Sequence, residues 1–132
     1  MLKVRIFSFS FLRTGIPEDS SGNGGGFVFD CRFIHNPGKH PEFMPLTGKN
    51  PEIIEFLDSN KEMQKFLVKV YDIIDEAIEK YILRNFTDLM VSFGCTGGQH
   101  RSVYSAEKLK SYLTKRYKDK IHIELKHLDI PF

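Results

Sequence analysis

The chain has 132 residues, 41% of them hydrophobic and 27% charged, and its formal net charge of +2 is too small to indicate a nucleic-acid-binding protein by itself. Two cysteines, Cys31 and Cys95, are too few for a disulfide framework, and no apolar run is long enough for a secretory signal or a membrane span. We therefore expect one domain over residues 1–132, located in the cytoplasm and without a membrane partner.

The first part of the chain predicts two strands joined by a glycine-rich loop. Alternating apolar residues predict a strand over Lys3–Phe11, and a second apolar run predicts a strand over Phe27–Phe33. The loop at 13–26 contains too many glycines for regular structure. Its Gly-x-Gly-x-Gly run leads into a strand, whereas a dinucleotide-binding loop must open a helix. We therefore predict only flexibility for this loop.

Two helices are predicted after a connection at 35–48 that contains three prolines. Asn50 followed by Pro51 is a favoured start for a short first helix. Ser59, with Glu62 three residues later, fits a capping box at the start of a longer second helix. The apolar residues of that helix predict a core stripe of Phe66, Val70, Ile73, Ala77 and Tyr81.

The last part of the chain predicts a strand over Leu89–Phe93, a helix over Val103–Tyr117 and a final strand over Ile121–Leu125. The apolar residues of that helix recur at helical spacing and predict a core stripe of Val103, Ala106, Leu109, Leu113 and Tyr117. The resulting order, β-β-α-α-β-α-β, predicts an α/β fold, a single layered domain with a mixed or mainly parallel sheet flanked by helices. Ligands of such sheets bind at the carboxyl ends of the strands, and the segment Gly94–Ser102 follows one of them.

The segment Gly94–Ser102 predicts an anion site. A glycine-rich loop that leads into a helix turns several backbone N–H groups toward one point, and the positive end of the helix dipole adds to their attraction. Arg101 contributes a planar fork of donors. A small phosphorylated ligand is the expected partner. The candidate ligand-binding residues of this segment are Thr96, Gly97, Gly98, Gln99, His100, Arg101 and Ser102.

The same segment permits an alternative interpretation as an enzyme. The spacing Cys95-x5-Arg101-Ser102 is that of cysteine-dependent phosphatases, in which a thiolate attacks phosphorus and the arginine binds the transition state. The positive surroundings would lower the pKa of the thiol. Asp30 or Asp88 would have to serve as the general acid. The structural alternative is that Cys95 is only a small residue beneath the loop, and in that case the chain has no catalytic residue.

The whole string Gly94–Glu107 resembles the signature of the C-terminal domain of the RapZ family of RNase adapters. Upstream residues match the same domain in the same order, namely Gly15-Ile16-Pro17, Asp30-Cys31-Arg32-Phe33, Asn36-Pro37 and Pro45-Leu46-Thr47-Gly48. The resemblance implies a sensor of an amino-sugar phosphate, glucosamine-6-phosphate. It implies ligand contacts from the loop residues Thr96, Gly97, Gly98, His100 and Arg101, and by motif position from Arg32 and Asn36.

The resemblance also implies partners. Members of the family bind RNA, self-associate and help to present a small regulatory RNA to a ribonuclease, so RNA and a separate nucleotide-binding or RNase protein are candidate partners. Full-length members carry a P-loop domain, but this chain has no Gly-x4-Gly-Lys-Ser/Thr motif, and no cofactor is expected. The candidate RNA-binding residues are Lys108, Lys115, Arg116, Lys118 and Lys120. Their structural alternative is a solvated helix face.

Two further expectations concern assembly and metals. The family resemblance implies a homo-oligomer, and Phe7, Phe9 and Phe11 share one face of the first strand that needs a cover. His35 and His40 lie in one loop, but no cysteine or carboxylate spacing near them supports a metal site, and none is expected.

Arg32 and His100 also have structural alternatives to ligand binding. Arg32 follows Asp30 by two residues, so the two side chains can form an ion pair on the same face of a strand. His100 can donate a hydrogen bond to the backbone instead of contacting a phosphate or a sugar hydroxyl.

Overall fold

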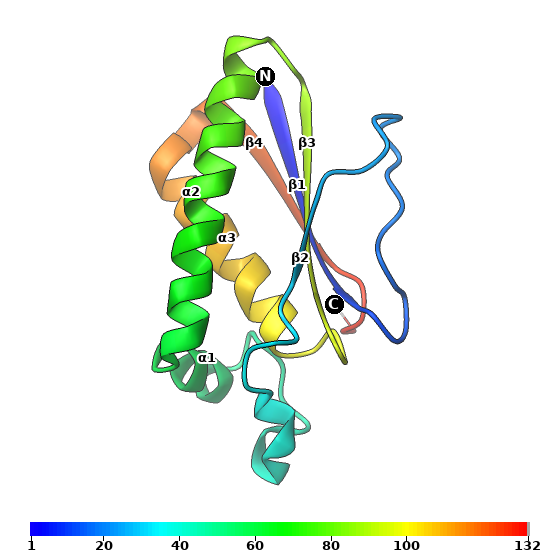
Figure 1. Ribbon diagram of the computed structural model, residues 1–132, viewed down its shortest axis with the longest axis vertical. Helices are drawn as coiled ribbons and strands as arrows, with labels where there is room; N and C mark the ends of the chain where they lie inside the picture. The colour runs from blue at the N-terminus through cyan, green and yellow to red at the C-terminus, as the bar shows by residue number, and fades with distance from the viewer. Residues whose placement is uncertain (132) are drawn as a thin grey trace.

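The computed structural model describes residues 1–131, which form an open sheet covered by helices in the order that the sequence predicts (Figure 1). The strands are β1 (Leu2–Ser10), β2 (Phe27–Asp30), β3 (Asp88–Cys95) and β4 (Ile121–His127). The helices are α1 (Pro51–Asp58), α2 (Lys61–Leu83) and α3 (Arg101–Tyr117). None of the helices within residues 1–131 has both the length and the apolar character to cross a membrane.

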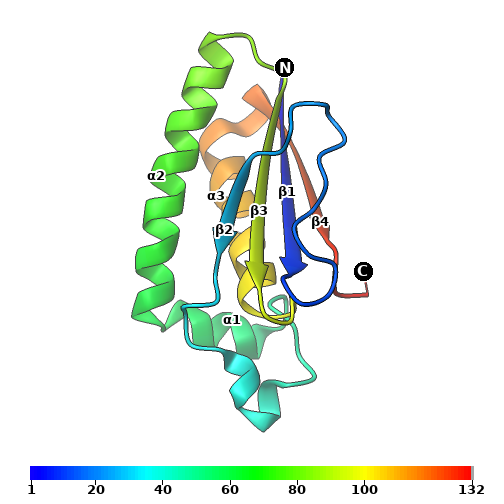
Figure 2. The same ribbon diagram turned by 45° about the vertical axis from the view of Figure 1, so that its right-hand side comes forward.

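The sheet is entirely parallel, with the strand order β2-β3-β1-β4. This confirms the α/β prediction. The connections β2–α1–α2–β3 and β3–α3–β4 run in the same direction across the sheet. Because such crossovers are almost always right-handed, their helices must cover the same face. Figures 1 and 2 show all three helices on that face and the β1–β2 loop across the other.

The core lies between the sheet and the helices α2 and α3. The stripe predicted for α3 is confirmed, since its members are buried: Val103, Ala106, Leu109, Leu113 and Tyr117. The stripe predicted for α2 is wrong in part, because Ile73 is 44% exposed. The residues of α2 that are buried are Met63, Leu67, Val70, Ile74 and Ile78. Adjacent apolar pairs such as Ile73-Ile74 allow two neighbouring stripes, and periodicity alone does not select one.

The cap of α2 also differs from the prediction by one residue. Asn60, not Ser59, is the N-cap, and its Oδ1 accepts the N–H of Met63 at 2.9 Å. The Ser59 hydroxyl donates instead to the carbonyl of Glu55 at the end of α1. An asparagine is at least as good an N-cap as a serine, so the Ser-x-x-Glu pattern could not decide between them.

Helix α1 begins at Pro51 as predicted, but Asn50 caps it without a side-chain hydrogen bond to the helix. The Asn50 Oδ1 accepts the N–H of Thr47 at 2.8 Å. The predicted ends of two strands were also too late. The strand β1 stops at Ser10, whose hydroxyl accepts the next N–H groups of the turn, and β2 stops at Asp30.

The β1–β2 loop has more internal structure than its glycines predict. The carboxylate of Asp19 accepts backbone N–H groups of Ser21, Asn23 and Gly25 and receives the Arg5 guanidinium at 2.6 Å. These hydrogen bonds, first of all those from Ser21, lower the pKa of Asp19. One carboxylate therefore organises the loop and holds it against β1.

Candidate functional site

The predicted anion loop lies where the sequence indicates, between the end of β3 and the start of α3, at the carboxyl edge of the sheet. A cavity of about 210 Å³ opens beside it. The residues that line the cavity are Asn36, Gly38, Met44, Cys95, Thr96, Gly97, Gln99, His100 and Arg101. The structure thus brings most of the predicted ligand-binding residues together, while Gly98, Ser102 and Arg32 lie outside this lining.

Arg101 is the central residue of the site and is only 3% exposed. Its Nη1 donates to the carbonyl oxygens of Arg32 at 2.9 Å and Ile34 at 2.6 Å, and more distantly to that of Cys31. Its Nη2 lies 3.5 Å from Thr96 Oγ1. Among residues 1–131 its buried Nε has no hydrogen-bond partner. The guanidinium therefore ties the loop to the segment after β2 and leaves the Nε N–H without a partner among the described residues.

Gln99 and His100 attach the loop to residues 43–46, which precede α1. The Gln99 amide donates to the carbonyl oxygens of Met44 and Leu46, each at 2.6 Å. The His100 Nε2 lies 2.9 Å from the carbonyl oxygen of Phe43, so it must carry the proton, and Nδ1 is then an acceptor. Burial lowers the pKa of His100 and favours this neutral form. The alternative predicted for His100, a hydrogen bond to the backbone, is thus present at its Nε2 atom.

The anion loop packs against the end of β1. Gly98 has φ of +65°, and a Cβ there would lie 2.8 Å from the Ser10 nitrogen and 2.9 Å from the Asp129 Cβ. Asp129 accepts the Ser10 N–H at 2.7 Å, and the Ser10 hydroxyl donates to the Thr96 carbonyl at 2.6 Å. Ser10 and Asp129 are absent from the residues predicted for the site. Their only signal in the sequence was position, since each ends or closely follows a strand at this edge.

Cys95 ends β3 and is 2% exposed. Its thiol lies 3.1 Å from the Ser102 hydroxyl. The cavity lining contains no carboxylate among the described residues. Of the two candidate general acids, Asp30 lies opposite Gly94 at the same edge of the sheet, with its carboxylate paired to Arg32, whereas Asp88 begins β3 at the opposite end of the sheet.

Arg32 and Asn36, the positions suggested by the family resemblance, differ in placement. The Arg32 guanidinium lies 3.8 Å above the Phe11 ring and forms a two-pronged ion pair with Asp30. The hydrogen bonds from Arg32 lower the pKa of Asp30. Asn36 lines the cavity, and its Oδ1 accepts the N–H of Gly38 at 2.9 Å.

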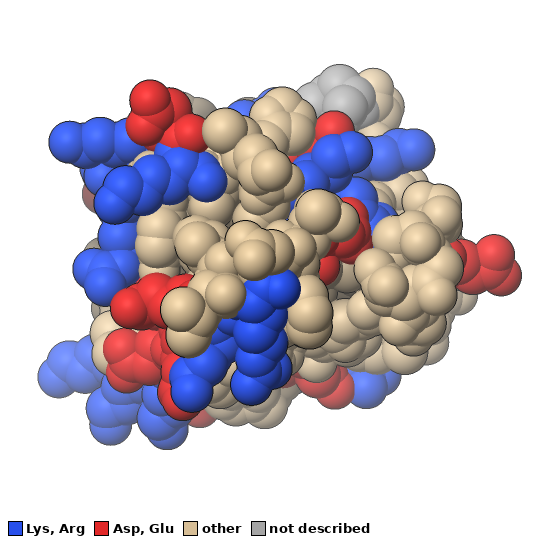
Figure 3. Space-filling view, turned by 90° about the horizontal axis from the view of Figure 1, so that it is seen from above, with Lys and Arg blue, Asp and Glu red and all other residues tan. Residues whose placement is uncertain are grey.

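The basic residues suggested for RNA binding do not form one uniform patch. Lys108 pairs with Asp58 at 3.0 Å and Arg116 pairs with Asp75 at 3.1 Å. The remaining three are exposed, namely Lys115, Lys118 and Lys120. Figure 3 looks onto the end of the molecule where β1 begins and shows Lys and Arg interleaved with Asp and Glu on the helical side.

The histidine pair in the loop after β2 has its two Nε2 atoms 3.1 Å apart, between His35 and His40. Within residues 1–131 no group of three or more His, Cys, Asp or Glu side chains is arranged to hold a metal ion.

Comparison with known proteins agrees with the family resemblance seen in the sequence. A family described as the RapZ C-terminal domain matches residues 2–131. A nucleotide-binding protein of Fervidobacterium nodosum is 40% identical over 128 residues, which are 96% of this chain and 42% of the relative. One of Clostridium perfringens is 38% identical over 130 residues, 98% of this chain and 41% of the relative. The chain thus spans about two fifths of the length of these relatives.

Proposed function

The chain belongs to the RapZ C-terminal domain family, and from this premise we propose that it is a sensory domain that binds a phosphate ester beside Gly94–Ser102. The ligand that the family resemblance implies is an amino-sugar phosphate such as glucosamine-6-phosphate. Binding, rather than turnover, is the proposed activity.

The buried Arg101 is the observation that carries this proposal. A buried N–H without a partner costs about 1–3 kcal/mol, and native structures rarely leave one. Here the orphan is Arg101 Nε, in a side chain that lines the cavity at the N-terminus of the 17-residue helix α3. A phosphate oxygen would satisfy this N–H and would also meet the positive end of the helix dipole.

The rest of the cavity suits the organic part of a small ligand. Its volume of about 210 Å³ is below the roughly 300–1,000 Å³ of sites for drug-sized ligands, so it suits only a small molecule. The unprotonated Nδ1 of His100 is an acceptor that a sugar hydroxyl or ammonium group can meet. Asn36 lies in the same lining and offers a carboxamide. These groups support a polar ligand that carries donors beside its phosphate.

A cysteine-dependent phosphatase is the second candidate. The observation in its favour is the 3.1 Å separation of the Cys95 thiol from the Ser102 hydroxyl, which would stabilise a thiolate. Two observations count against it. The described cavity lining holds no carboxylate for acid catalysis, and Arg101 directs Nη1 at backbone carbonyls rather than at the thiol. We therefore rank binding above catalysis.

We further propose, from the family resemblance, that the chain works in the cytoplasm, self-associates and meets RNA and a ribonuclease or nucleotide-binding partner. Support for the RNA surface comes from the exposed residues Lys115, Lys118 and Lys120. The ion pairs of Lys108 and Arg116 with acidic residues weaken the case for those two positions.

A thermal-shift series tests the proposed ligand class. Glucosamine-6-phosphate, glucosamine and inorganic phosphate are compared at equal concentrations. A ligand present at a hundred times its Kd stabilises the folded state by about 2.7 kcal/mol. We expect the phosphorylated sugar to stabilise the chain most, inorganic phosphate less and glucosamine least. Equal and negligible effects of all three would contradict the proposal.

A further inference from the structure

A second cavity, of about 470 Å³, lies at the opposite end of β3 from the anion loop. With a rise of about 3.3 Å per residue, the seven steps from Asp88 to Cys95 place the two ends of β3 about 23 Å apart. The residues that line this second cavity are Asn23, Gly25, Gly26, Phe27, Tyr81, Phe86, Thr87, Asp88, Leu89 and Met90. Nothing in the proposed phosphate site uses it.

The cavity lies against an open stretch of strand edge. The strand β1 pairs with β3 from Asp88 onward, whereas β2 pairs with β3 only from Val91 onward. The Cys31 N–H bonds to the Gly94 carbonyl, so the even-numbered residues of β3 direct their backbone groups toward the β2 side. Among the described residues, Asp88 and the Met90 N–H therefore have no strand opposite them.

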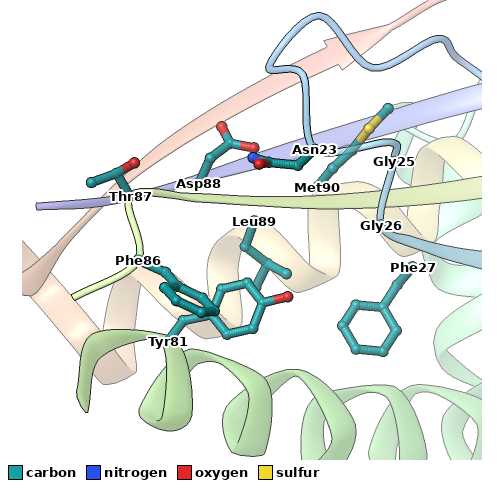
Figure 4. Close-up of a pocket in the computed structure, with 10 residues that line it drawn as sticks. All are labelled: Asn23, Gly25, Gly26, Phe27, Tyr81, Phe86, Thr87, Asp88, Leu89 and Met90. Atoms are coloured by element: carbon teal, nitrogen blue, oxygen red, sulfur yellow. The ribbon is translucent and has the colours of Figure 1, made fainter. Parts of the chain in front are cut away.

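The side chains that line the second cavity differ between the two faces of the sheet. Figure 4 shows the Phe27, Tyr81 and Leu89 side chains on the side of β3 that faces α2, and those of Asn23 and Asp88 on the other side. The open volume thus lies at the edge, in the plane of the sheet. An extended chain fits this arrangement, because its side chains point alternately to the two faces.

The charge of the cavity is negative. Asp88 is the one charged residue in its described lining. The Arg5 guanidinium that neutralises Asp88 is shared with Asp19, so the three groups carry a net charge of −1. A cationic side chain on the Asn23 side would complement this charge, while an apolar side chain would face Tyr81 and Leu89.

We propose that this second cavity binds an extended peptide segment with alternating basic and apolar residues. The peptide would add to the sheet beside Asp88–Met90, in line with β2. Backbone hydrogen bonds to the open edge would supply affinity, and the two walls would supply specificity. Gly26 brings the loop close to the strand, since a Cβ there would lie 2.1 Å from the Met90 carbonyl oxygen.

An NMR titration of the labelled chain with a blocked pentapeptide, Lys-Val-Lys-Val-Lys, tests this proposal. We expect saturable shifts at the amides of Asp88 and Met90. The matching Glu-Val-Glu-Val-Glu peptide should bind about fivefold more weakly, the upper end of the effect of one exposed charge pair. A Lys-Val peptide with methylated backbone nitrogens should not bind, because it lacks the donors that the edge requires.

Variants of exposed residues serve as matched controls. Phe86 is 47% exposed and lines the cavity, so Phe86→Ala should weaken peptide binding, whereas Phe33→Ala, at a 63% exposed position outside the lining, should not. Asp88→Asn should remove the preference for lysine. If this variant does not fold, the two peptides of opposite charge make the same test on the unaltered chain.

Three outcomes would overturn the proposal. The first is an absence of saturable shifts at the open edge. The second is equal affinity for the basic and acidic peptides. The third is occupation of the cavity by a planar probe such as indole when no peptide binds, which would identify a small-molecule pocket.

Discussion

The Arg101 Nη1 donates to the carbonyl oxygen of Ile34 at 2.6 Å, and this bond joins the first turn of α3 to the segment after β2. The residues are 67 positions apart in the chain. The side chain predicted from sequence to bind an anion therefore also supports the structure of its site. A substitution of Arg101 must be judged by stability as well as by ligand binding.

Arg101→Ala should lower the free energy of unfolding by about 3 kcal/mol, because it leaves buried carbonyl oxygens without their charged donor. Urea unfolding measures this change. Arg13→Ala, at an exposed position of the β1–β2 loop, is the control. Its free energy of unfolding should stay within about 0.5 kcal/mol of that of the unaltered chain. A fully stable Arg101→Ala variant would contradict the structural role.

Asn60→Ala should destabilise the chain by about 1 kcal/mol through loss of the N-cap of α2. Ser59→Ala should have a smaller effect, because its hydroxyl only donates to an exposed carbonyl at the end of α1. Thermal unfolding of the two variants side by side distinguishes them. A larger loss of stability in Ser59→Ala than in Asn60→Ala would identify Ser59 as the N-cap of α2.

Gly98→Ala should cost about 2 kcal/mol, since Gly98 has a positive φ and a Cβ would crowd the Ser10 nitrogen. Gly97→Ala is the matched control, because a Cβ there meets no atom within 4 Å. Its stability should stay within about 0.5 kcal/mol of the unaltered chain. Equal losses in denaturant unfolding would argue against close support of the loop by β1.

Stability should fall as the pH drops below about 6.5, the ordinary pKa of histidine, because of His100. Burial lowers the pKa of His100 in the folded state, so between the two pKa values the unfolded chain binds more protons. His100→Gln should weaken this dependence in urea unfolding at pH 5.5 and 7.5. The exposed His122→Gln should leave it unchanged.

The sequence predicted the order of the elements and the place of the anion loop because these depend on local patterns. The stripe of α3 is a single clean period ending at Tyr117, and it was confirmed. The stripe of α2 was wrong in part, because Ile73 and Ile74 are equally apolar and only the sheet beneath them selects Ile74.

The contacts within the site could not be predicted, because they join distant parts of the chain. No local pattern indicates that Asp129 would hold the end of β1, or that Gln99 would donate to carbonyls more than fifty residues earlier. The same is true of Asp19, which looks like one polar residue in a glycine-rich loop and yet organises that loop around Arg5.

The most direct test of the central claim is a calorimetric titration of glucosamine-6-phosphate into the unaltered chain and into Cys95→Ser, with phosphate release measured in the same samples. Serine keeps the approximate volume of the thiol and adds no charge, so the account predicts equal affinities and no release of phosphate. Release by the unaltered chain that disappears in Cys95→Ser would establish a phosphatase and contradict the assignment as a sensor.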